Sequence, residues 1–462
     1  MINFCYTLQS AKNFCAVLLL IPAFMLFSNA AHAQDSTKIS GLISVDPELD
    51  ESRDYSGIGV TIILLGTENV VDTLYHAVTK VDGTFSGVAE FPGKDQYLMM
   101  ISRNQRTLYS SSIVLQADDE ITIQGELPHF ENTRQVTSFE NNAMTNLNRI
   151  ERNYNRIVDF INYGEVEQDT IPTLIHTWSD LFWSVQDSYP NTLASDMGKL
   201  RSVEILNGWH DDLMLQRIDE SMAEGTRYKV EKATFAAGAI IRKENLRAGI
   251  AYIDSVSATF DSREKQLDLK MLKTELYLDH NYISDAINTL RVIERDYTVY
   301  EELQGWIDFT MYDLENLSKG HRMPEFNLDL LFEDGDVSNE SLADKVYLFE
   351  IVNLADRGYQ LEYNLMLMLY GDYHEKGLEF VSVPINDSGV LVRAFYEERG
   401  LFWNVGSPIS LAEQDLVETL NIGTVPTRFL VDSNGLIVRK YSGTDISIIQ
   451  NDIKELLDEE NL

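Results

Sequence analysis

Two thiols, Cys5 and Cys15, carry the most specific chemistry that this 462-residue chain could offer. Two cysteines allow a disulfide or a redox pair, because a thiolate attacks sulfur in thiol–disulfide exchange. Both lie within the first 33 residues. Removal of that segment would leave a chain without any thiol, and the sequence then predicts no redox catalysis.

The first 33 residues have the pattern of an export signal. A lysine precedes an apolar run over residues 14–27, and Ala-His-Ala at 31–33 gives the small-x-small pattern of a cleavage site. We therefore expect cleavage between Ala33 and Gln34 and a periplasmic or secreted protein. An uncleaved anchor is the alternative, but the run is shorter than the roughly 20 residues that a membrane span needs. No transmembrane segment is expected after cleavage.

The charge balance limits the partners. The chain has 73 acidic and 37 basic residues, for a formal net charge of −36. This excess disfavours binding to nucleic acid or anionic lipid, both of which attract basic surfaces. The sequence contains no nucleophile elbow, phosphate-binding loop, zinc motif or dinucleotide fingerprint. We predict no cofactor and no metal site. An enzyme of another chemistry, such as a hydrolase, stays an alternative.

Residues 36–128 have the pattern of an antiparallel β-sandwich. Residues 60–65 form a strongly β-branched run, and further β-rich runs follow with turn residues between them. Asp82-Gly83 separates two such runs, and this pair predicts a tight hairpin. The acidic stretch 46–54 matches no calcium-loop spacing, so we interpret it as a solvated loop.

Residues 134–318 change to a helical period. Apolar residues spaced by three or four between Met144 and Ile161 predict one long helix. Further helices are expected at 172–188, 193–222, 226–243, 246–260, 263–279, 284–296 and 300–317. An irregular helical bundle is favoured. A tetratricopeptide array stays an alternative, because residues 286–290 fit the second helix of such a unit while no second copy follows at a fixed period.

Residues 320–462 alternate between strands and helices. The apolar runs 345–352 and 378–384 flank a helical pattern that ends at Gly377 and has Leu361, Leu365, Met368 and Leu369 on one face. Strand, helix and strand in this order predict a βαβ unit. A helix is expected over 411–420. Two antiparallel strands around the turn 432–435 and a last helix over 445–457 complete the pattern.

Three motifs in this region resemble one family. They are GHRMPEFNL at 320–328, EKGLEF at 375–380 and IGTVPTRFLVD at 422–432. Together they resemble the TlpA-like and thiol-specific-antioxidant branch of the thioredoxin fold. The β-rich front of the chain resembles a carboxypeptidase-regulatory-like β-sandwich. The expected fold class is therefore multidomain α+β: a β-sandwich at 36–128, a helical region at 134–318 and a thioredoxin-like α/β domain at 320–462.

The resemblance implies a Cys-x-x-Cys pair at the start of the first helix of the thioredoxin-like domain. Counting back from Gly377 places Asp356-Arg357-Gly358-Tyr359 there. We therefore predict a degenerate, thiol-free site with no catalytic residue, and a protein that is not an enzyme. Asp356 is expected to cap the helix, since a carboxylate at a helix start accepts backbone N–H groups. Alternatively, Asp356, Arg357 and Tyr359 rim a peptide groove.

The proline loop is the second part of the candidate site. The resemblance implies a cis bond between Val425 and Pro426, with the residue before the proline pairing with an extended segment. Thr424, Val425 and Pro426 are thus candidate peptide-binding residues, although the turn could also persist only for the hairpin. The expected function is a non-catalytic binding or scaffold role in the cell envelope, with an unknown envelope protein or peptide as partner. A thiol-independent chaperone and a family-type thiol–disulfide oxidoreductase are the alternatives.

Overall fold

The computed structural model describes residues 35–48, 51–65, 71–162, 164–222, 227–297, 301–385, 389–443 and 446–460. The predicted signal segment, with Cys5 and Cys15, lies outside these residues. The chain divides into two compact units, of which one spans Pro22–Ala239 and the other contains Ile240–Leu462. The domain boundaries drawn from the sequence stay predictions. No helix among the described residues is long and apolar enough to cross a membrane.

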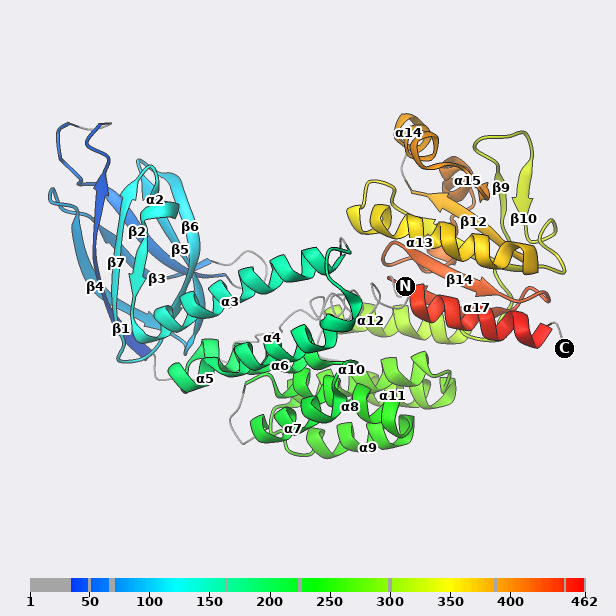
Figure 1. Ribbon diagram of the computed structural model, residues 1–462, viewed down its shortest axis with the longest axis horizontal. Coiled ribbons are helices and arrows are strands. Elements are labelled where there is room, and N and C mark those ends of the chain that lie inside the picture. Colours follow the sequence, from blue (N-terminus) through cyan, green and yellow to red (C-terminus); the bar gives the residue numbers. More distant parts are fainter. Residues whose placement is uncertain are drawn as a thin grey trace. The chain divides into compact units, whose positions relative to one another are not determined.

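The strands of the first unit form two four-stranded sheets (Figure 1). One sheet has the order β4 (Thr84–Phe91), β1 (Asp35–Val45), β7 (Glu120–Leu127) and β8 (Gln135–Thr137). The other has the order β3 (Val71–Val78), β2 (Ile58–Leu65), β5 (Asp95–Arg103) and β6 (Arg106–Leu115). Alternate residues of both sheets, such as Ile39 and Ile62, fill one core. β1 and β7 pair in parallel, so the predicted purely antiparallel pairing is wrong for these strands.

The Asp82-Gly83 turn connects the two sheets. β3 pairs with β2, whereas β4 pairs with β1 in the other sheet. The N–H of Lys80 donates to the carbonyl of Thr84 and the N–H of Gly83 donates to the carbonyl of Lys80, which closes the turn. Gly83 has a φ of 81°, which favours glycine. The prediction of a turn is therefore confirmed, but the hairpin is wrong, because a turn signal does not determine which strands pair beyond the turn.

The helices of this unit lie largely where the sequence predicts them, except over residues 193–222. The first unit continues with α2 (Phe130–Thr133), α3 (Phe139–Asn162), α4 (Ile171–Trp183), α5 (Val185–Ser188), α6 (Leu193–Leu206), α7 (Asp211–Ser221) and most of α8 (Lys229–Lys243). The predicted helix over 193–222 is wrong as a single element. Gly208 has a φ of 76° and donates its N–H to the Asp211 carboxylate at 3.0 Å, which ends one helix and starts the next.

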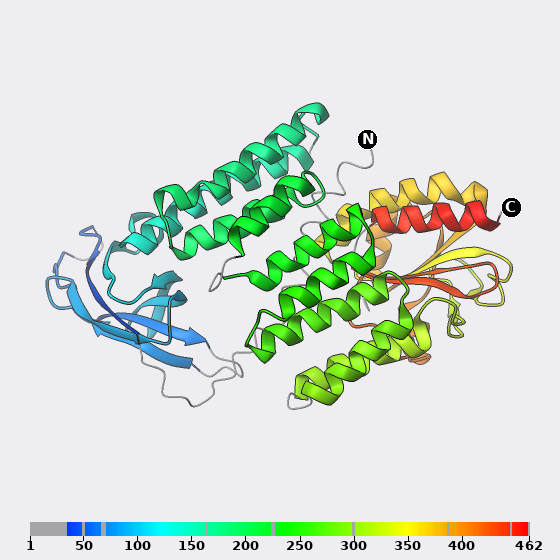
Figure 2. The ribbon, with the colours of Figure 1, turned by 90° about the horizontal axis from the view of Figure 1, so that it is seen from below.

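The second unit begins with a group of helices (Figure 2). These are α9 (Leu246–Ser257), α10 (Arg263–Asp279), α11 (Ile283–Tyr297) and α12 (Glu301–Tyr312), followed by the π-helical turn η3 (Asp313–Leu317). α10 and α11 pack against each other through Leu267, Leu290 and Ile293.

The C-terminal sheet has the order β13-β12-β11-β14-β15. Its strands are β11 (Val346–Val352), β12 (Leu378–Pro384), β13 (Asn404–Val405), β14 (Thr427–Val431) and β15 (Ile437–Ser442). The first three run parallel, and β14 and β15 are antiparallel to their neighbours. α13 (Arg357–Tyr373) connects β11 to β12, so the predicted βαβ unit and the later strand pair are confirmed. The short pair β9 (Asn327–Asp329) and β10 (Asp336–Ser338) precedes this sheet.

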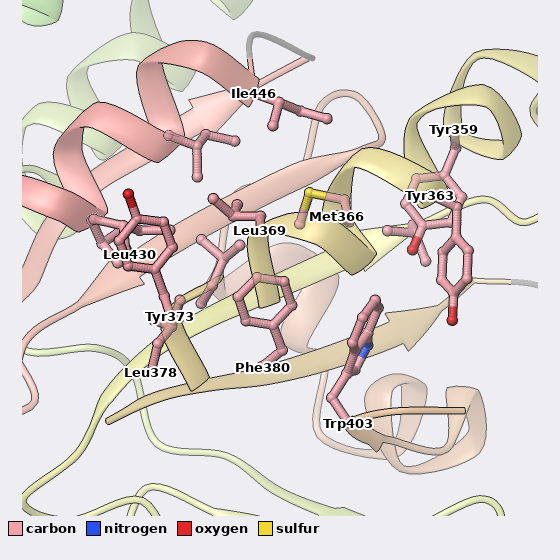
Figure 3. Close-up of a cluster of buried hydrophobic side chains, with 14 of the residues drawn as sticks. Tyr359, Tyr363, Met366, Leu369, Tyr373, Leu378, Phe380, Trp403, Leu430 and Ile446 are labelled. Carbon is pink, nitrogen blue, oxygen red and sulfur yellow. The ribbon is translucent and has the colours of Figure 1, made fainter. Parts of the chain in front are cut away.

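Four more helices complete this domain. α14 (Gly389–Arg399) was not predicted. α15 (Pro408–Glu413) and α16 (Leu416–Thr419) replace the single helix expected over 411–420, and α17 (Ile446–Glu460) is the expected last helix. Alternate residues of β11 face opposite layers: Leu348 shares a core with α13, α14 and α17, whereas Phe349 shares one with α15 and α16. Figure 3 shows Met366 and Leu369 of α13 in the first of these cores, together with Phe380 and Trp403.

The face of α13 on which the sequence places four apolar residues is only partly buried. Leu361 and Met368 are 63% and 43% exposed, whereas Leu369 is buried. Tyr363 and Met366 are fully buried instead. The helix carries two apolar stripes, and periodicity alone does not decide which of them is buried.

Two methionines on α13 test this assignment. We expect Met366→Ala to lower the free energy of unfolding by about 2–5 kcal/mol, because it leaves a cavity in the core. Met368→Ala is the matched control and should change it by no more than about 0.5 kcal/mol. Urea unfolding followed by circular dichroism measures both. A larger effect at Met368 would contradict the observed orientation of the helix.

Candidate functional site

A row of polar side chains crosses three strands of the C-terminal sheet. Ser382 on β12 and Arg428 on β14 are both register partners of Glu350 on β11. All three are fully buried. Leu348 and Phe380, which lie on the same face two positions away, belong to the hydrophobic core. The row is therefore a polar layer inside an apolar interior.

The Glu350 carboxylate is the centre of this row. Its Oε1 accepts hydrogen bonds from the Tyr359 hydroxyl at 2.8 Å and from the Ser382 hydroxyl at 2.5 Å. Its Oε2 accepts from Arg428 Nε at 2.9 Å. Trp403 Nε1 donates to the Ser382 oxygen at 2.7 Å and extends the chain of hydrogen bonds. A carboxylate can stay buried here because these donors replace water.

Arg428 joins the sheet to α13. Its Nη2 donates to Glu362 Oε2 at 3.3 Å, and both side chains are buried. Burial by itself would lower the pKa of Arg428, but the carboxylates of Glu350 and Glu362 outweigh burial and raise it. The guanidinium therefore stays charged. One ion network thus ties β11, β14 and α13 together.

The candidate residues at the start of α13 differ in their exposure. Asp356 caps the helix, as predicted: its Oδ1 accepts the N–H of Tyr359 at 2.9 Å. Asp356 and Arg357 are exposed. Tyr359 is fully buried, and burial, with a further contribution from Glu350, raises its pKa well above 10. The alternative in which Tyr359 rims a peptide groove is wrong for this residue, because its hydroxyl turns inward and donates to Glu350.

The proline loop lies at the same end of the sheet as the start of α13. The Val425–Pro426 bond is cis, as the resemblance implied. Thr427, directly after it, is the register partner of Ile351 near the end of β11. The chain passes from that end to Asp356. The structure therefore brings the loop and the start of α13 together at one edge of the domain.

The residues of the proline loop differ in exposure and in hydrogen bonding. Thr424 is exposed, Val425 is half-buried and Pro426 is buried. The Thr427 hydroxyl donates to the carbonyl of Thr424 at 2.5 Å. The N–H of Gly443 donates to the carbonyl of Pro426 at 3.0 Å. Within the described residues, the backbone N–H and C=O of Val425 have no hydrogen-bond partner. Such groups can pair with an added extended strand.

The sequence analysis missed Glu350 and Arg428. Each is a charged residue inside an apolar strand, in the runs VYLFEIV and TRFLV. Charged residues are seldom buried unless they are paired, so a charge in a strand covered on both faces indicates a buried partner. This signal was present, but the identity of the partner depends on the register of β11 and β14.

Comparison with known proteins gives relatives for part of the chain. No family model matches it. A protein named thiol-disulfide oxidoreductase ResA from Bacillus thuringiensis is 26% identical over 147 residues, which cover 30% of this chain and 82% of the relative. The ResA protein of Geobacillus thermodenitrificans is 33% identical over 91 residues, or 20% of this chain and 48% of the relative. The first matched stretch is about as long as the predicted thioredoxin-like domain.

Solved structures include similar domains. The thioredoxin domain of a thiol-disulfide oxidoreductase from Bacteroides vulgatus is 22% identical, with a TM-score of 0.28, and the match covers 31% of this chain and 99% of that domain. A thiol:disulfide interchange protein from Bacteroides sp. is 20% identical, with the same TM-score, over 30% of this chain and 91% of that protein. Over about 30% of its length, the chain is similar to thioredoxin-like thiol-disulfide oxidoreductases. The TlpA-like and carboxypeptidase-regulatory-like resemblances stay predictions.

These relatives correct one prediction. The sequence analysis expected a protein that is not an enzyme, whereas the matched relatives are named as oxidoreductases, which are enzymes. The first turn of α13 carries no thiol, and both cysteines of the sequence lie outside the described residues. Nothing therefore shows a loss of activity, and that prediction is withdrawn.

The buried ion pair makes a stability test possible. We expect Arg428→Met to lower the free energy of unfolding by about 3–5 kcal/mol, because two carboxylates then stay buried without their cation. Adding Glu350→Leu should recover part of this loss, so the double variant should be more stable than the sum of the two single changes implies. Urea unfolding of the three variants measures this.

An exposed cross-strand pair is the control. Lys38 and Glu120 are register partners on β1 and β7, with 3.6 Å between Nζ and Oε1, and both are mostly exposed. Lys38→Met should change the free energy of unfolding by less than about 1 kcal/mol. Additive effects at Glu350 and Arg428 would show that their contact does not hold the domain together.

Proposed function

We propose that the C-terminal domain binds extended polypeptide segments at the proline loop, residues 424–426. The observation that supports this most is the half-buried Val425, whose backbone N–H and C=O have no partner within the described residues. An added strand would satisfy both groups. Backbone pairing of this kind tolerates many sequences, so the site suits partners that share an extended conformation.

The buried row supports the proposal, because it holds the loop in place. Arg428 lies two residues after Pro426 and is bonded to Glu350 and Glu362. The start of β14 is thereby attached to β11 and to α13. A loop that is already fixed loses little conformational entropy when a partner binds.

The names of the relatives are consistent with a polypeptide partner. The relatives are named thiol-disulfide oxidoreductases, and an oxidoreductase that acted on a disulfide within a polypeptide would have to hold the segment that carries it. We extend the proposal to an exported protein with a binding or scaffold role in the cell envelope, on the basis of the apolar segment and the Ala-His-Ala pattern that precede Gln34.

A permanently unfolded, thiol-free polypeptide tests the binding without any redox step. Reduced and carboxymethylated α-lactalbumin, labelled with a fluorophore, is the probe, and anisotropy gives the Kd for the full chain. We expect Val425→Asp to weaken binding at least about tenfold, or about 1.4 kcal/mol, because the added strand would have to desolvate the new carboxylate.

Val88→Asp is the matched control. Val88 is an exposed valine on β4, in the other compact unit, and its change should leave the Kd unaltered. Circular dichroism checks that both variants are folded. Failure of the unchanged protein to bind the probe, or equal Kd values for both variants, would refute the proposed function.

A further inference from the structure

Helix α12 is attached to the segment that leads into the proline loop, within the same compact unit. The Tyr312 hydroxyl donates to the carbonyl of Thr419 at 3.0 Å. The side-chain amide of Asn421 donates to the carbonyl of Phe309 at 2.9 Å and to the Asp313 carboxylate at 2.8 Å. Two hydrogen bonds to the end of α12 and one to the first residue of η3 therefore fix this part of the chain against residues 419–421.

A largely covered ion pair strengthens this attachment. Lys440 Nζ on β15 lies 2.7 and 2.8 Å from the two carboxylate oxygens of Asp313. It also donates to the carbonyls of Leu420 and Asn421, at 3.1 and 2.9 Å. The two side chains of the pair are 9% and 14% exposed. One cation thus binds the turn after α12 and the segment before the loop at the same time.

The ring of Phe309 lies over Gly423. A Cβ atom added to Gly423 would be 3.0 and 3.1 Å from two ring carbons, closer than an ordinary contact. Gly423 is exposed, and Phe309 keeps 37% of its surface exposed. The absence of a side chain at Gly423 therefore lets an aromatic ring reach the surface only two residues from Val425.

We propose that Phe309 is a specificity-determining residue, which receives a large apolar side chain of the polypeptide segment that pairs with Val425. This rests on the proposed function and adds a side-chain preference to it. A strand paired with Val425 presents every second side chain on one side, so one of them can contact the ring. A partly exposed aromatic ring on a fixed helix gains by covering its apolar surface, as aromatic anchors of interfaces do.

The surroundings of the ring favour an apolar side chain over an acidic one. The ammonium of Lys440 lies 5.4 Å from the centre of the Phe309 ring. This ammonium is already occupied by the Asp313 carboxylate and by two carbonyls. Because its charge is already compensated, Lys440 does not favour an acidic side chain of the partner.

A pair of peptide panels tests this inference. Both consist of thiol-free peptides with the same alanine- and threonine-rich host, in which a single leucine or a single glycine is moved along the chain. Fluorescence anisotropy gives the Kd for the full-length protein. We expect the best leucine peptide to bind roughly tenfold more tightly than its glycine counterpart. Phe309→Ala should remove this preference and leave the Kd of the glycine peptide unchanged, whereas Phe309→Leu should retain part of the preference.

The controls separate the two proposals. Phe160→Ala changes an exposed phenylalanine on α3 in the other unit and should keep the preference. Gly423→Ala displaces the ring without removing it and should also reduce the preference, so the test does not depend on the folding of one variant. Binding with an unchanged preference in both Phe309→Ala and Gly423→Ala would overturn this inference and leave the proposed function standing. No binding of either panel by the unchanged protein would overturn the proposed function itself.

Discussion

The buried ion pair between Glu350 and Arg428 is the constraint on which the C-terminal domain depends. Neither charge can stay in the core without the other, because an unpaired buried ion costs several kcal/mol. Their contact requires that β11 and β14 keep the observed register. A slip by one residue would move Arg428 to the opposite face of the sheet. The pair therefore fixes both the sheet and the position of the proline loop that precedes β14.

The same pair determines the orientation of α13. Tyr359 donates to Glu350 and Glu362 accepts from Arg428, and residues three apart lie on one face of a helix. Met366, one helical turn after Glu362, then also faces the core. Leu361 must face outward as a consequence. Polar contacts thus help to decide which face of α13 is buried.

The sequence predicted the parts of the structure that local signals determine. The βαβ unit, the Asp356 cap and the strand pair β14–β15 follow from runs of a few residues and their spacing. Pairing between distant segments could not be predicted from the sequence. The strands beside Asp82-Gly83 enter different sheets, and Glu350 contacts Arg428, which lies 78 positions away in the sequence. The cis bond at Val425–Pro426 was predicted, whereas the inward turn of Tyr359 depends on that distant contact.

Two sets of contacts hold the proline loop from opposite ends. The Glu350–Arg428 network fixes the chain after Pro426, and the Asp313–Lys440 pair fixes it before Gly423. Between them, the backbone of Val425 is left without a partner within the described residues. Hydrogen–deuterium exchange of the full chain, with and without an unfolded thiol-free polypeptide, tests the role of this segment most directly. The account predicts slower exchange of the amides of residues 423–425 on binding. Unchanged exchange there, with slower exchange at another surface, would contradict it.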